Sequence, residues 1–217
     1  MHLAVILDGN RRFAKKNGMS IEEGYRIAAE RVEEFFRWFY KRKDVKILSL
    51  YALSMLNFKN RPKSQIKCLI NLFYKKLKNH LEEVEKYKGR YCVKIVSFIK
   101  SEMPKKLRDL VDYANREFSK GERKIYFLFG YDSETELENA LRLSKINGKP
   151  LRENLLVKEP VDLLVRTGNE KRLSGFLLYQ ASQAQIYFEK RMFPETNKHV
   201  WNYWIRWFNS QERRFGR

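Results

Sequence analysis

Short apolar runs alternate along the chain with longer segments in which apolar residues recur every three or four positions. Runs that are apolar at nearly every position are typical of strands covered on both faces, as in a parallel sheet. Alternation of such runs with helical segments predicts an α/β domain built on a mainly parallel sheet. The predicted strands are Leu3–Leu7, Val45–Leu50, Cys92–Val96, Lys124–Phe129, Val161–Val165 and Gln185–Phe188.

Helical periodicity predicts five helices, at Glu22–Arg42, Ser64–Tyr87, Lys105–Phe118, Glu134–Leu143 and Lys198–Glu212. The first carries an apolar stripe of Ala28, Val32, Phe35, Phe36 and Phe39, and the second carries one of Ile66, Leu69, Ile70, Phe73, Leu77 and Leu81. Stripes of this spacing face the core of a globular protein. The last helix is rich in aromatic residues, a pattern that favours core or a dimer interface over a cofactor-binding face. Its apolar residues are Trp201, Trp204, Trp207 and Phe208, together with the aliphatic Ile205.

The length and composition predict one folded domain. A chain of 217 residues fits a single domain, residues 1–217, and a hydrophobic fraction of 43% argues against disorder. Met1–Asp8 lacks a cationic leader, and we expect it to form a buried strand and not a signal peptide. No apolar stretch approaches the roughly 20 residues that span a bilayer. Cys68 and Cys92 lie in apolar contexts, which predicts buried thiols in a reducing cytoplasm.

The chain is strongly basic, with 45 Lys and Arg residues against 26 Asp and Glu and a formal net charge of +19. Such a charge attracts polyanions: nucleic acid, anionic lipid headgroups or diphosphates. A solvated lysine-rich surface without a binding role would have the same composition. Because the chain carries no recognised nucleic-acid motif, we expect no nucleic-acid partner.

Three polar clusters each follow a predicted strand: Asp8–Arg12, Ser54–Arg61 and Arg166–Ser174. In open parallel sheets, ligands bind beyond the carboxyl ends of the strands. We therefore expect these three clusters to lie close together. Each is basic or carries hydroxyl groups, so together they favour a site for an anion.

The first cluster has the residues expected of a magnesium and phosphate site. Gly9 allows the backbone to approach a ligand, and Arg11 and Arg12 can bind phosphate oxygens. Magnesium binds through one or two carboxylates plus substrate phosphates, which makes Asp8 its natural ligand. A helix-capping Asp beside a surface arginine pair explains this cluster equally well. In the third cluster, Arg166 and Arg172 with Ser174 have the pattern of a diphosphate clamp, although an ordinary basic loop would look the same.

The same segments resemble a known family. Asp8–Lys16 reads DGNRRFAKK, Tyr51–Pro62 reads YALSMLNFKNRP, and Val161–Glu189 reads VDLLVRTGNEKRLSGFLLYQASQAQIYFE. Phe193-Pro194-Glu195 and a terminal Arg213-Arg214-Phe215-Gly216 follow. In order and spacing these segments resemble the signature regions of the cis-prenyltransferases, the group that contains undecaprenyl diphosphate synthase and dehydrodolichyl diphosphate synthase. Agreement over the whole chain is more specific than any single motif.

The resemblance implies a six-stranded parallel sheet flanked by helices, a hydrophobic tunnel for the growing chain, and usually a dimer. It implies a Mg²⁺-dependent enzyme that condenses isopentenyl diphosphate with an allylic prenyl diphosphate to make a Z-prenyl diphosphate, for use in a glycosyl-carrier lipid. We expect it in the cytoplasm, where its basic surface would bind the anionic membrane that receives the product.

The resemblance also implies roles for individual residues. Asp8 would hold magnesium; Gly9, Asn10 and Arg12 would cradle the allylic diphosphate; and Asn57 would assist deprotonation or positioning. Isopentenyl diphosphate would be held by Arg166, Arg172 and Ser174. The loop that closes over substrate would contain Ser54 and Phe58, and Arg214 and Gly216 would complete the partner subunit's site. The remaining expected substrate-binding residues are Arg11, Phe13, Tyr25 and Arg61.

The chain departs from the family pattern at several positions. Tyr25 replaces the usual histidine after Gly24, and Ile21 replaces an arginine found in many members. Gln185 stands where the family has a second acidic metal ligand, and an amide would bind magnesium weakly. Leu56 replaces an acidic residue that the family has before Asn57, and one extra residue precedes Arg61.

Asp8 and the paired arginines remain, which favours an active enzyme over a non-catalytic subunit. Two alternatives stay open: a partner subunit of a heteromeric cis-prenyltransferase, which would form a heterodimer with a homologous chain, and an atypical short-chain prenyltransferase.

Overall fold

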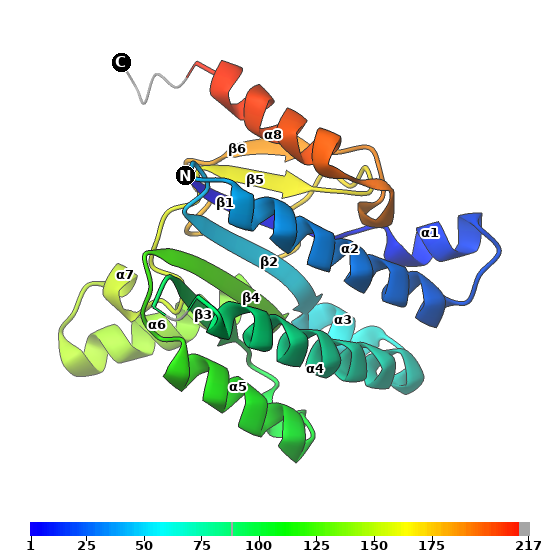
Figure 1. The fold of residues 1–217 in the computed structure, drawn as a ribbon. Helices are drawn as coiled ribbons and strands as arrows, with labels where there is room; N and C mark the ends of the chain where they lie inside the picture. The colour runs from blue at the N-terminus through cyan, green and yellow to red at the C-terminus, as the bar shows by residue number, and fades with distance from the viewer. Residues whose placement is uncertain (88, 213–217) are drawn as a thin grey trace.

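The computed structural model describes residues 1–87 and 89–212, and its centre is a sheet of six parallel strands (Figure 1). The strands lie in the order β3-β4-β2-β1-β5-β6. The predicted six-stranded parallel sheet is confirmed, and β2 and β4 extend further toward their carboxyl ends than predicted. The strands are β1 (His2–Ile6), β2 (Ile47–Ser54), β3 (Tyr91–Val96), β4 (Arg123–Tyr131), β5 (Leu163–Arg166) and β6 (Gln185–Phe188).

The helices are α1 (Asn10–Lys16), α2 (Ile21–Lys41), α3 (Met55–Asn60), α4 (Lys63–Glu85), α5 (Lys105–Glu117), α6 (Ser133–Asn147), α7 (Leu151–Asn154) and α8 (Lys198–Ser210). Two 3₁₀ turns, η1 (Lys100–Glu102) and η2 (Phe193–Glu195), complete the described elements. The predictions of α2, α4, α5, α6 and α8 are confirmed. The sequence pattern missed α3 and α7, because helices this short present no repeating apolar stripe. Within the described residues, no helix is long and apolar enough to cross a membrane.

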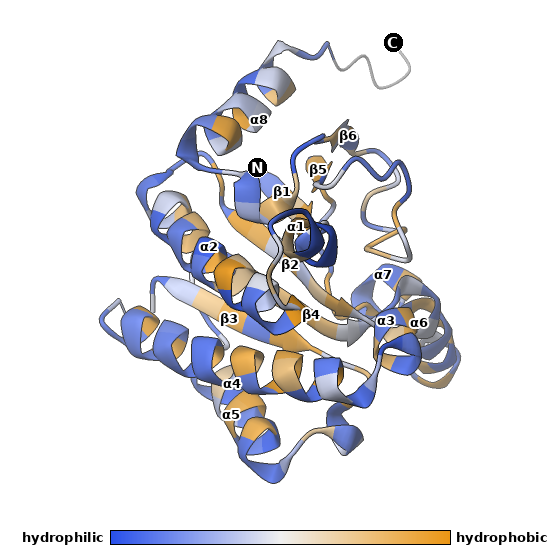
Figure 2. Ribbon diagram, turned by 90° about the vertical axis from the view of Figure 1, so that its right-hand side faces the viewer, coloured by the Kyte–Doolittle hydropathy of each residue, from blue (hydrophilic) through white to orange (hydrophobic). Residues whose placement is uncertain are grey.

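The sheet is covered on both faces, and a separate core fills each face. Along β1, Leu3 and Val5 point into the core beneath α2, α4, α5 and α8, whereas Ala4 and Ile6 point into the opposite core. In Figure 2 the strands are largely orange, between helices whose outer surfaces are blue. Burial on both sides explains why the strands are apolar at nearly every position.

The aromatic stripe of α8 belongs to the core and holds the segment after β6 in place. Trp201 and Trp204 are fully buried, and their rings lie 4.9 and 6.2 Å from that of Phe35 on α2. The indole of Trp204 donates to the buried carboxylate of Glu189 (3.0 Å), and the Phe193 amide donates to the backbone oxygen of Asp8 (2.9 Å). These contacts fix residues 189–193 against the end of β1.

An apolar cavity of about 580 Å³ lies between α2, α4 and the sheet. Leu69, Leu72 and Phe73 are among the side chains that line it. One end lies at Leu7, Asn10 and Tyr25, and the other at Tyr40 and His80. Along α2, Tyr25 and Tyr40 are roughly 22 Å apart at 1.5 Å per residue. The cavity therefore extends along most of the length of α2.

The two cysteines are free and differ in exposure. Cys92 on β3 is buried, as predicted. Cys68 on α4 is only half-buried, because it lies at the edge of the apolar stripe beside buried Ile66 and Ile70, so the prediction of two buried thiols holds for Cys92 alone.

Candidate active site

The sheet topology brings the first and third polar clusters together. β1 lies between β2 and β5. After β1 the chain forms β2, β3 and β4 on one side of this strand, and it then forms β5 and β6 on the other side. Such a switch point opens a crevice beyond the strand ends. Ile6, the last residue of β1, pairs with Arg166, the last residue of β5, and Asp8 follows two residues later. Asp8 and Arg166 thus meet at the crevice, as the sequence predicted.

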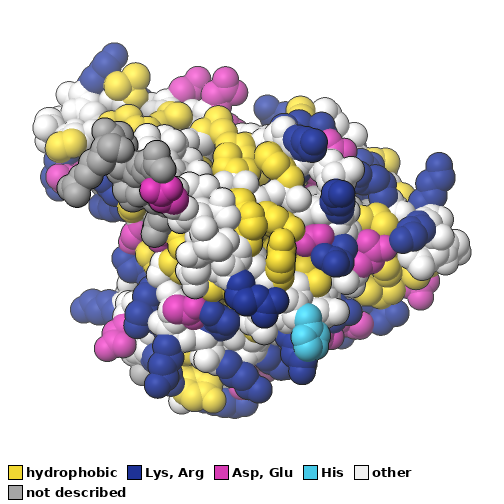
Figure 3. All heavy atoms as spheres, turned by 90° about the horizontal axis from the view of Figure 1, so that it is seen from above, with side chains coloured by type: hydrophobic (Ala, Val, Ile, Leu, Met, Phe, Trp, Pro, Cys, Tyr) yellow, Lys and Arg dark blue, Asp and Glu magenta, His cyan; other side chains and the backbone are white. Residues whose placement is uncertain are grey.

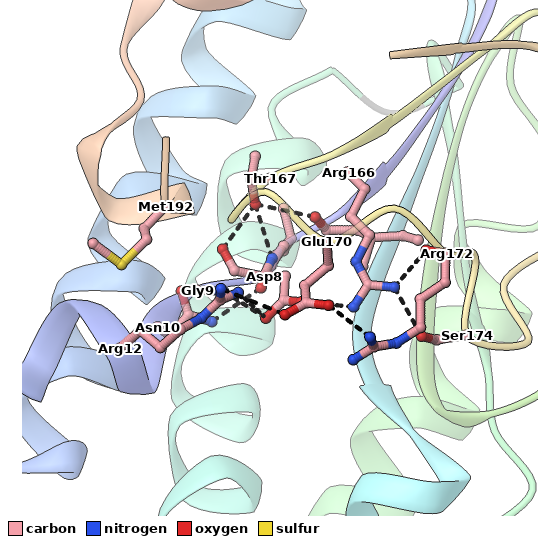
Figure 4. A network of polar contacts seen from close by, with 12 residues as sticks. Asp8, Gly9, Asn10, Arg12, Arg166, Thr167, Glu170, Arg172, Ser174 and Met192 are labelled. Carbon is pink, nitrogen blue, oxygen red and sulfur yellow. Dashed lines mark hydrogen bonds and ion pairs between the residues drawn. The ribbon is translucent and has the colours of Figure 1, made fainter. Parts of the chain in front are cut away.

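Asp8 is held in one orientation by its neighbours (Figure 4). Its Oδ2 accepts from Arg166 Nη2 (2.7 Å), and its Oδ1 accepts from the Gly9 amide (2.6 Å) and lies 3.7 Å from Arg12 Nη2. Its backbone amide donates to Thr167 Oγ1 (2.9 Å), and that hydroxyl lies 2.8 Å from the Asp8 carbonyl oxygen. The carboxylate is about one third exposed and remains accessible to a ligand.

Arg166 is a buried guanidinium, with a side-chain exposure of 5%. Besides Asp8, it donates through Nη1 to Ser174 Oγ (2.8 Å) and to the backbone oxygen of Arg172. Arg172 itself is exposed and pairs with Glu170 (2.6 Å), whose other oxygen lies 3.5 Å from Arg12 Nη1. The predicted clamp residues are therefore adjacent, and they are linked to Arg12 through Glu170.

Two glycines are required by close backbone packing. Gly9 has φ 101°, and a Cβ there would lie 2.6 Å from Cγ of Met192. Gly168 has φ 83°, and its Cβ would lie 2.7 Å from Nη2 of Arg12. A side chain at either position would meet both strained backbone and occupied space. Gly9 thus packs closely against Met192, a contact that the sequence did not suggest.

The second cluster is a short helix and not the predicted loop. Ser54 ends β2, and its Oγ accepts from the Asn57 amide (3.0 Å), which caps α3. Phe58 packs against the main core, and Asn57 is half-buried. A serine cap directly after a strand supplies a helix start, which is why the chain turns into α3 without a loop.

Beyond α3, Arg61 joins the site through Tyr25. Its Nη1 donates to the Tyr25 hydroxyl (3.1 Å), which lies 3.3 Å from Gln65 Oε1. Burial raises the pKa of Tyr25, so the phenol is neutral at physiological pH. Arg61 also interacts electrostatically with Asp8 and Arg11. Gln65 was not predicted from sequence, because its contact with Tyr25 spans 40 positions.

Three buried polar atoms near the crevice have no hydrogen-bond partner among the described residues: Asn10 Oδ1, Arg61 Nε and Arg166 Nε. A buried polar group left unpaired costs about 1–3 kcal/mol, so water, an ion or a ligand is expected to pair with such groups. Asn10 lines the cavity, and its Nδ2 donates to the Leu7 oxygen (3.0 Å). Phe13 is half-buried on α1 and is not among the residues that line the cavity.

The Asp8 carboxylate fits a magnesium ion that is bound together with a diphosphate. In the described part of the chain, no group of three or more His, Cys, Asp or Glu side chains could hold a metal. An all-protein metal cage is therefore missing there, but Mg²⁺ commonly takes one or two carboxylates and completes its shell with phosphates and water. Asp8 supplies such a carboxylate beside arginine donors.

Two predicted groups are not brought to Asp8. Gln185 begins β6 and pairs with Leu163, so it lies at the opposite end of the sheet, roughly 10 Å along β5 from Arg166 at about 3.3 Å per residue. Within one chain it does not reach the Asp8 carboxylate. Arg214 and Gly216 lie outside the described residues.

Comparison with known proteins gives the family. The family model of the undecaprenyl diphosphate synthases matches residues 6–216. The chain is 32% identical over 231 residues to the tritrans,polycis-undecaprenyl-diphosphate synthase (geranylgeranyl-diphosphate specific) of Pyrococcus horikoshii, covering 100% of this chain and 86% of that protein. It is 32% identical over 234 residues to the ditrans,polycis-undecaprenyl-diphosphate synthase ((2E,6E)-farnesyl-diphosphate specific) of Buchnera aphidicola, covering 99% and 90%.

A solved structure agrees in fold. Lavandulyl diphosphate synthase from Lavandula x intermedia, in complex with dimethylallyl diphosphate, superposes with a TM-score of 0.89 at 25% identity, over 100% of this chain and 98% of that one. The fold, the site and these relatives lead to one conclusion. The chain belongs to the undecaprenyl diphosphate synthase family of cis-prenyltransferases.

Proposed function

We propose that this protein condenses isopentenyl diphosphate with an allylic prenyl diphosphate to form a Z-prenyl diphosphate of the kind used as a glycosyl-carrier lipid. The observation that carries this proposal is an arginine-rich crevice next to an apolar cavity of about 580 Å³, on the side where Leu7 and Asn10 line that cavity. A substrate with a diphosphate head and an isoprenoid tail has both of these features. The relatives are synthases of such products, which supports the same function.

The residues of the site fall into two groups, one for each substrate. Arg12 and Arg61 would neutralise the diphosphate that leaves the allylic substrate, while Arg166, Arg172 and Ser174 hold isopentenyl diphosphate for attack by its double bond. Departure of the diphosphate leaves positive charge on carbon, so water must be kept out. The apolar walls of the cavity would exclude water and accept the tail, and Asn57 would help to position or deprotonate the intermediate.

Asp8 would hold Mg²⁺ against the substrate diphosphates. A bound Mg²⁺ supplies charge neutralisation for the departing phosphate oxygens. If Asp8 binds the ion, calorimetry should find that inorganic diphosphate binds the protein more tightly with Mg²⁺ than with EDTA. Equal affinity in the two buffers would argue against a metal at this position.

The activity is tested with purified protein, Mg²⁺ and labelled isopentenyl diphosphate, with farnesyl and geranylgeranyl diphosphate as parallel starters, and with mass spectrometry of the products. Formation of a butanol-extractable prenyl diphosphate supports the enzyme. If product forms only after a homologous partner is added, the chain is a subunit of a heteromeric enzyme. Short products alone would favour the short-chain alternative.

Arg172→Ala should raise the KM for isopentenyl diphosphate by roughly tenfold or more, because a charge-assisted bond to a phosphate contributes about 1.5–3 kcal/mol. The KM of the allylic substrate should change little. Steady-state kinetics with each substrate varied in turn measure both values. Arg116→Ala, which removes an exposed arginine of α5 far from the site, is the control. An unchanged KM for isopentenyl diphosphate would mean that Arg172 does not bind this substrate.

We expect the chain to form a dimer through the side of the sheet where β6 and α8 lie. Seen from above in Figure 3, this face carries hydrophobic side chains across its middle. Leu178, Tyr179 and Tyr203 are each more than 40% exposed. Apolar side chains exposed in this way favour an interface over a solvated surface. Sedimentation equilibrium tests the homodimer, and co-purification with a homologous chain tests the heterodimer.

The net charge of +19 supports a cytoplasmic enzyme that binds an anionic membrane surface peripherally, where a lipid product must go. Liposome sedimentation with anionic and neutral lipid tests this binding. No preference for anionic lipid would exclude it, and tight salt-sensitive binding to RNA or DNA would favour the nucleic-acid alternative instead.

A further inference from the structure

Tyr25 occupies an unusual position between the cavity and the polar crevice. The residue is 3% exposed and lines one end of the cavity with Leu7 and Asn10. Its hydroxyl leaves the apolar wall and contacts two polar groups, Arg61 Nη1 at 3.1 Å and Gln65 Oε1 at 3.3 Å. The guanidinium of Arg61 also lies 5.8 Å from the centre of the Tyr25 ring. One side chain therefore binds Arg61 through both its ring and its oxygen.

The direction of the hydrogen bonds is determined by the partners. A neutral phenol has one proton to donate, and a guanidinium can only donate. Because Gln65 Oε1 accepts, the Tyr25 proton points to Gln65 and its lone pair points to Arg61. Gln65 thus orients the hydroxyl so that a lone pair faces Arg61.

Arg61 retains a donor for a ligand. Its Nε is buried and has no partner among the described residues. The guanidinium is near enough to Asp8 and Arg11 for their charges to act on it. A buried N–H without an acceptor, beside a second arginine, is expected where an anion binds.

The position of Tyr25 indicates which of the two substrates it helps to bind. If the long apolar tail of the allylic substrate enters the cavity, its diphosphate would lie at the end lined by Tyr25 and Asn10, next to the polar crevice. The predicted clamp for isopentenyl diphosphate, Arg166 with Ser174, is on the β5 side of the crevice. We propose that Tyr25 is a positioning residue that holds Arg61 in place for the diphosphate of the allylic substrate and has no part in binding isopentenyl diphosphate. This inference rests on the proposed function.

Tyr25→Phe tests the inference, because it removes only the hydroxyl. We expect the Kd of farnesyl diphosphate, measured by calorimetry without isopentenyl diphosphate, to rise roughly tenfold, as for loss of a hydrogen bond to a charged group. In steady-state assays the KM of farnesyl diphosphate should rise by a similar factor. The KM of isopentenyl diphosphate and kcat should stay close to those of the unmodified enzyme. Tyr113→Phe, on the exposed side of α5, is the matched control and should change none of these values.

A double-mutant cycle distinguishes positioning from mere packing. Because Tyr25 acts through Arg61, Tyr25→Phe should have no further effect on the Kd in an Arg61→Ala background. Tyr25→His, which restores an acceptor at this position, should recover part of the lost affinity. Thermal unfolding of each variant reports any general loss of stability.

Three outcomes would overturn the inference: an unchanged Kd for farnesyl diphosphate in Tyr25→Phe, equal rises in the KM of both substrates, or full additivity with Arg61→Ala. If the unmodified protein makes no product, the proposed enzymatic function fails, and the binding measurements still decide the role of Tyr25. If it is active and Tyr25→Phe binds normally, only the inference about Tyr25 fails.

Discussion

Asp8→Asn should reduce turnover by at least about 10³-fold, the scale of losses when a group that stabilises transition-state charge is removed. The amide retains an oxygen that can accept from Arg166 Nη2, which Asp8 Oδ2 contacts at 2.7 Å, so the fold should persist. What disappears is the negative charge expected to hold Mg²⁺ between the diphosphates. Product formation over a range of Mg²⁺ concentrations, with circular dichroism of the folded protein, measures the effect.

The control for this prediction is Asp109→Asn, which removes a carboxylate from an exposed ion pair with Lys105. It should leave turnover unchanged. Near-normal turnover in Asp8→Asn would mean that the proposed site does not depend on the Asp8 carboxylate. Recovery at high Mg²⁺ would mean that the amide only weakens metal binding.

His80→Ala should lengthen the prenyl products. At the far end of the cavity, the His80 ring belongs to a cluster in which it lies 4.2 Å from Phe36 and 5.4 Å from Phe127. Tyr40 approaches His80 through its hydroxyl, 3.2 Å from Nδ1. Because burial lowers the pKa of His80 to about 3, the imidazole is neutral at physiological pH and can face an apolar tail. Its removal would enlarge the cavity at this end, where the exposed residues Asn79 and Glu83 also line it.

Mass spectrometry of products from the unmodified enzyme, His80→Ala and His80→Phe tests the role of this cluster. His80→Phe keeps a ring of similar bulk and should leave the product length unchanged. The alanine variant should also lose about 2–4 kcal/mol of stability, as expected for a cavity, measured by denaturant unfolding. An unchanged product distribution in a destabilised but active His80→Ala would mean that chain length is decided elsewhere.

The sequence predicted the regular part of the fold because its signals are local. An unbroken apolar strand such as Leu3–Leu7, or the stripe of α2, follows from neighbours within a few residues, and both are found in the structure. The meeting of Asp8 and Arg166 was also predictable, since parallel strands share one end of the sheet. The family resemblance rests on the same local motifs, and the comparisons confirm it.

The features that the sequence missed depend on contacts between distant segments. Nothing near Gly9 indicates that Met192 fills the space beside it, and nothing near Tyr25 indicates that Gln65 orients its hydroxyl. α3 begins at a local cap on Ser54 and was missed because it is too short to show a repeating apolar stripe. Tertiary structure brought His80 against Phe36 at the far end of the cavity. It also separated Gln185 from Asp8, because β6 begins at the opposite end of the sheet. The sequence by itself determined the strands, the long helices and the charged groups at the strand ends, since each is specified by neighbouring residues. Which side chains touch was decided by packing across the whole domain, where geometry and not proximity in the chain selects the partners.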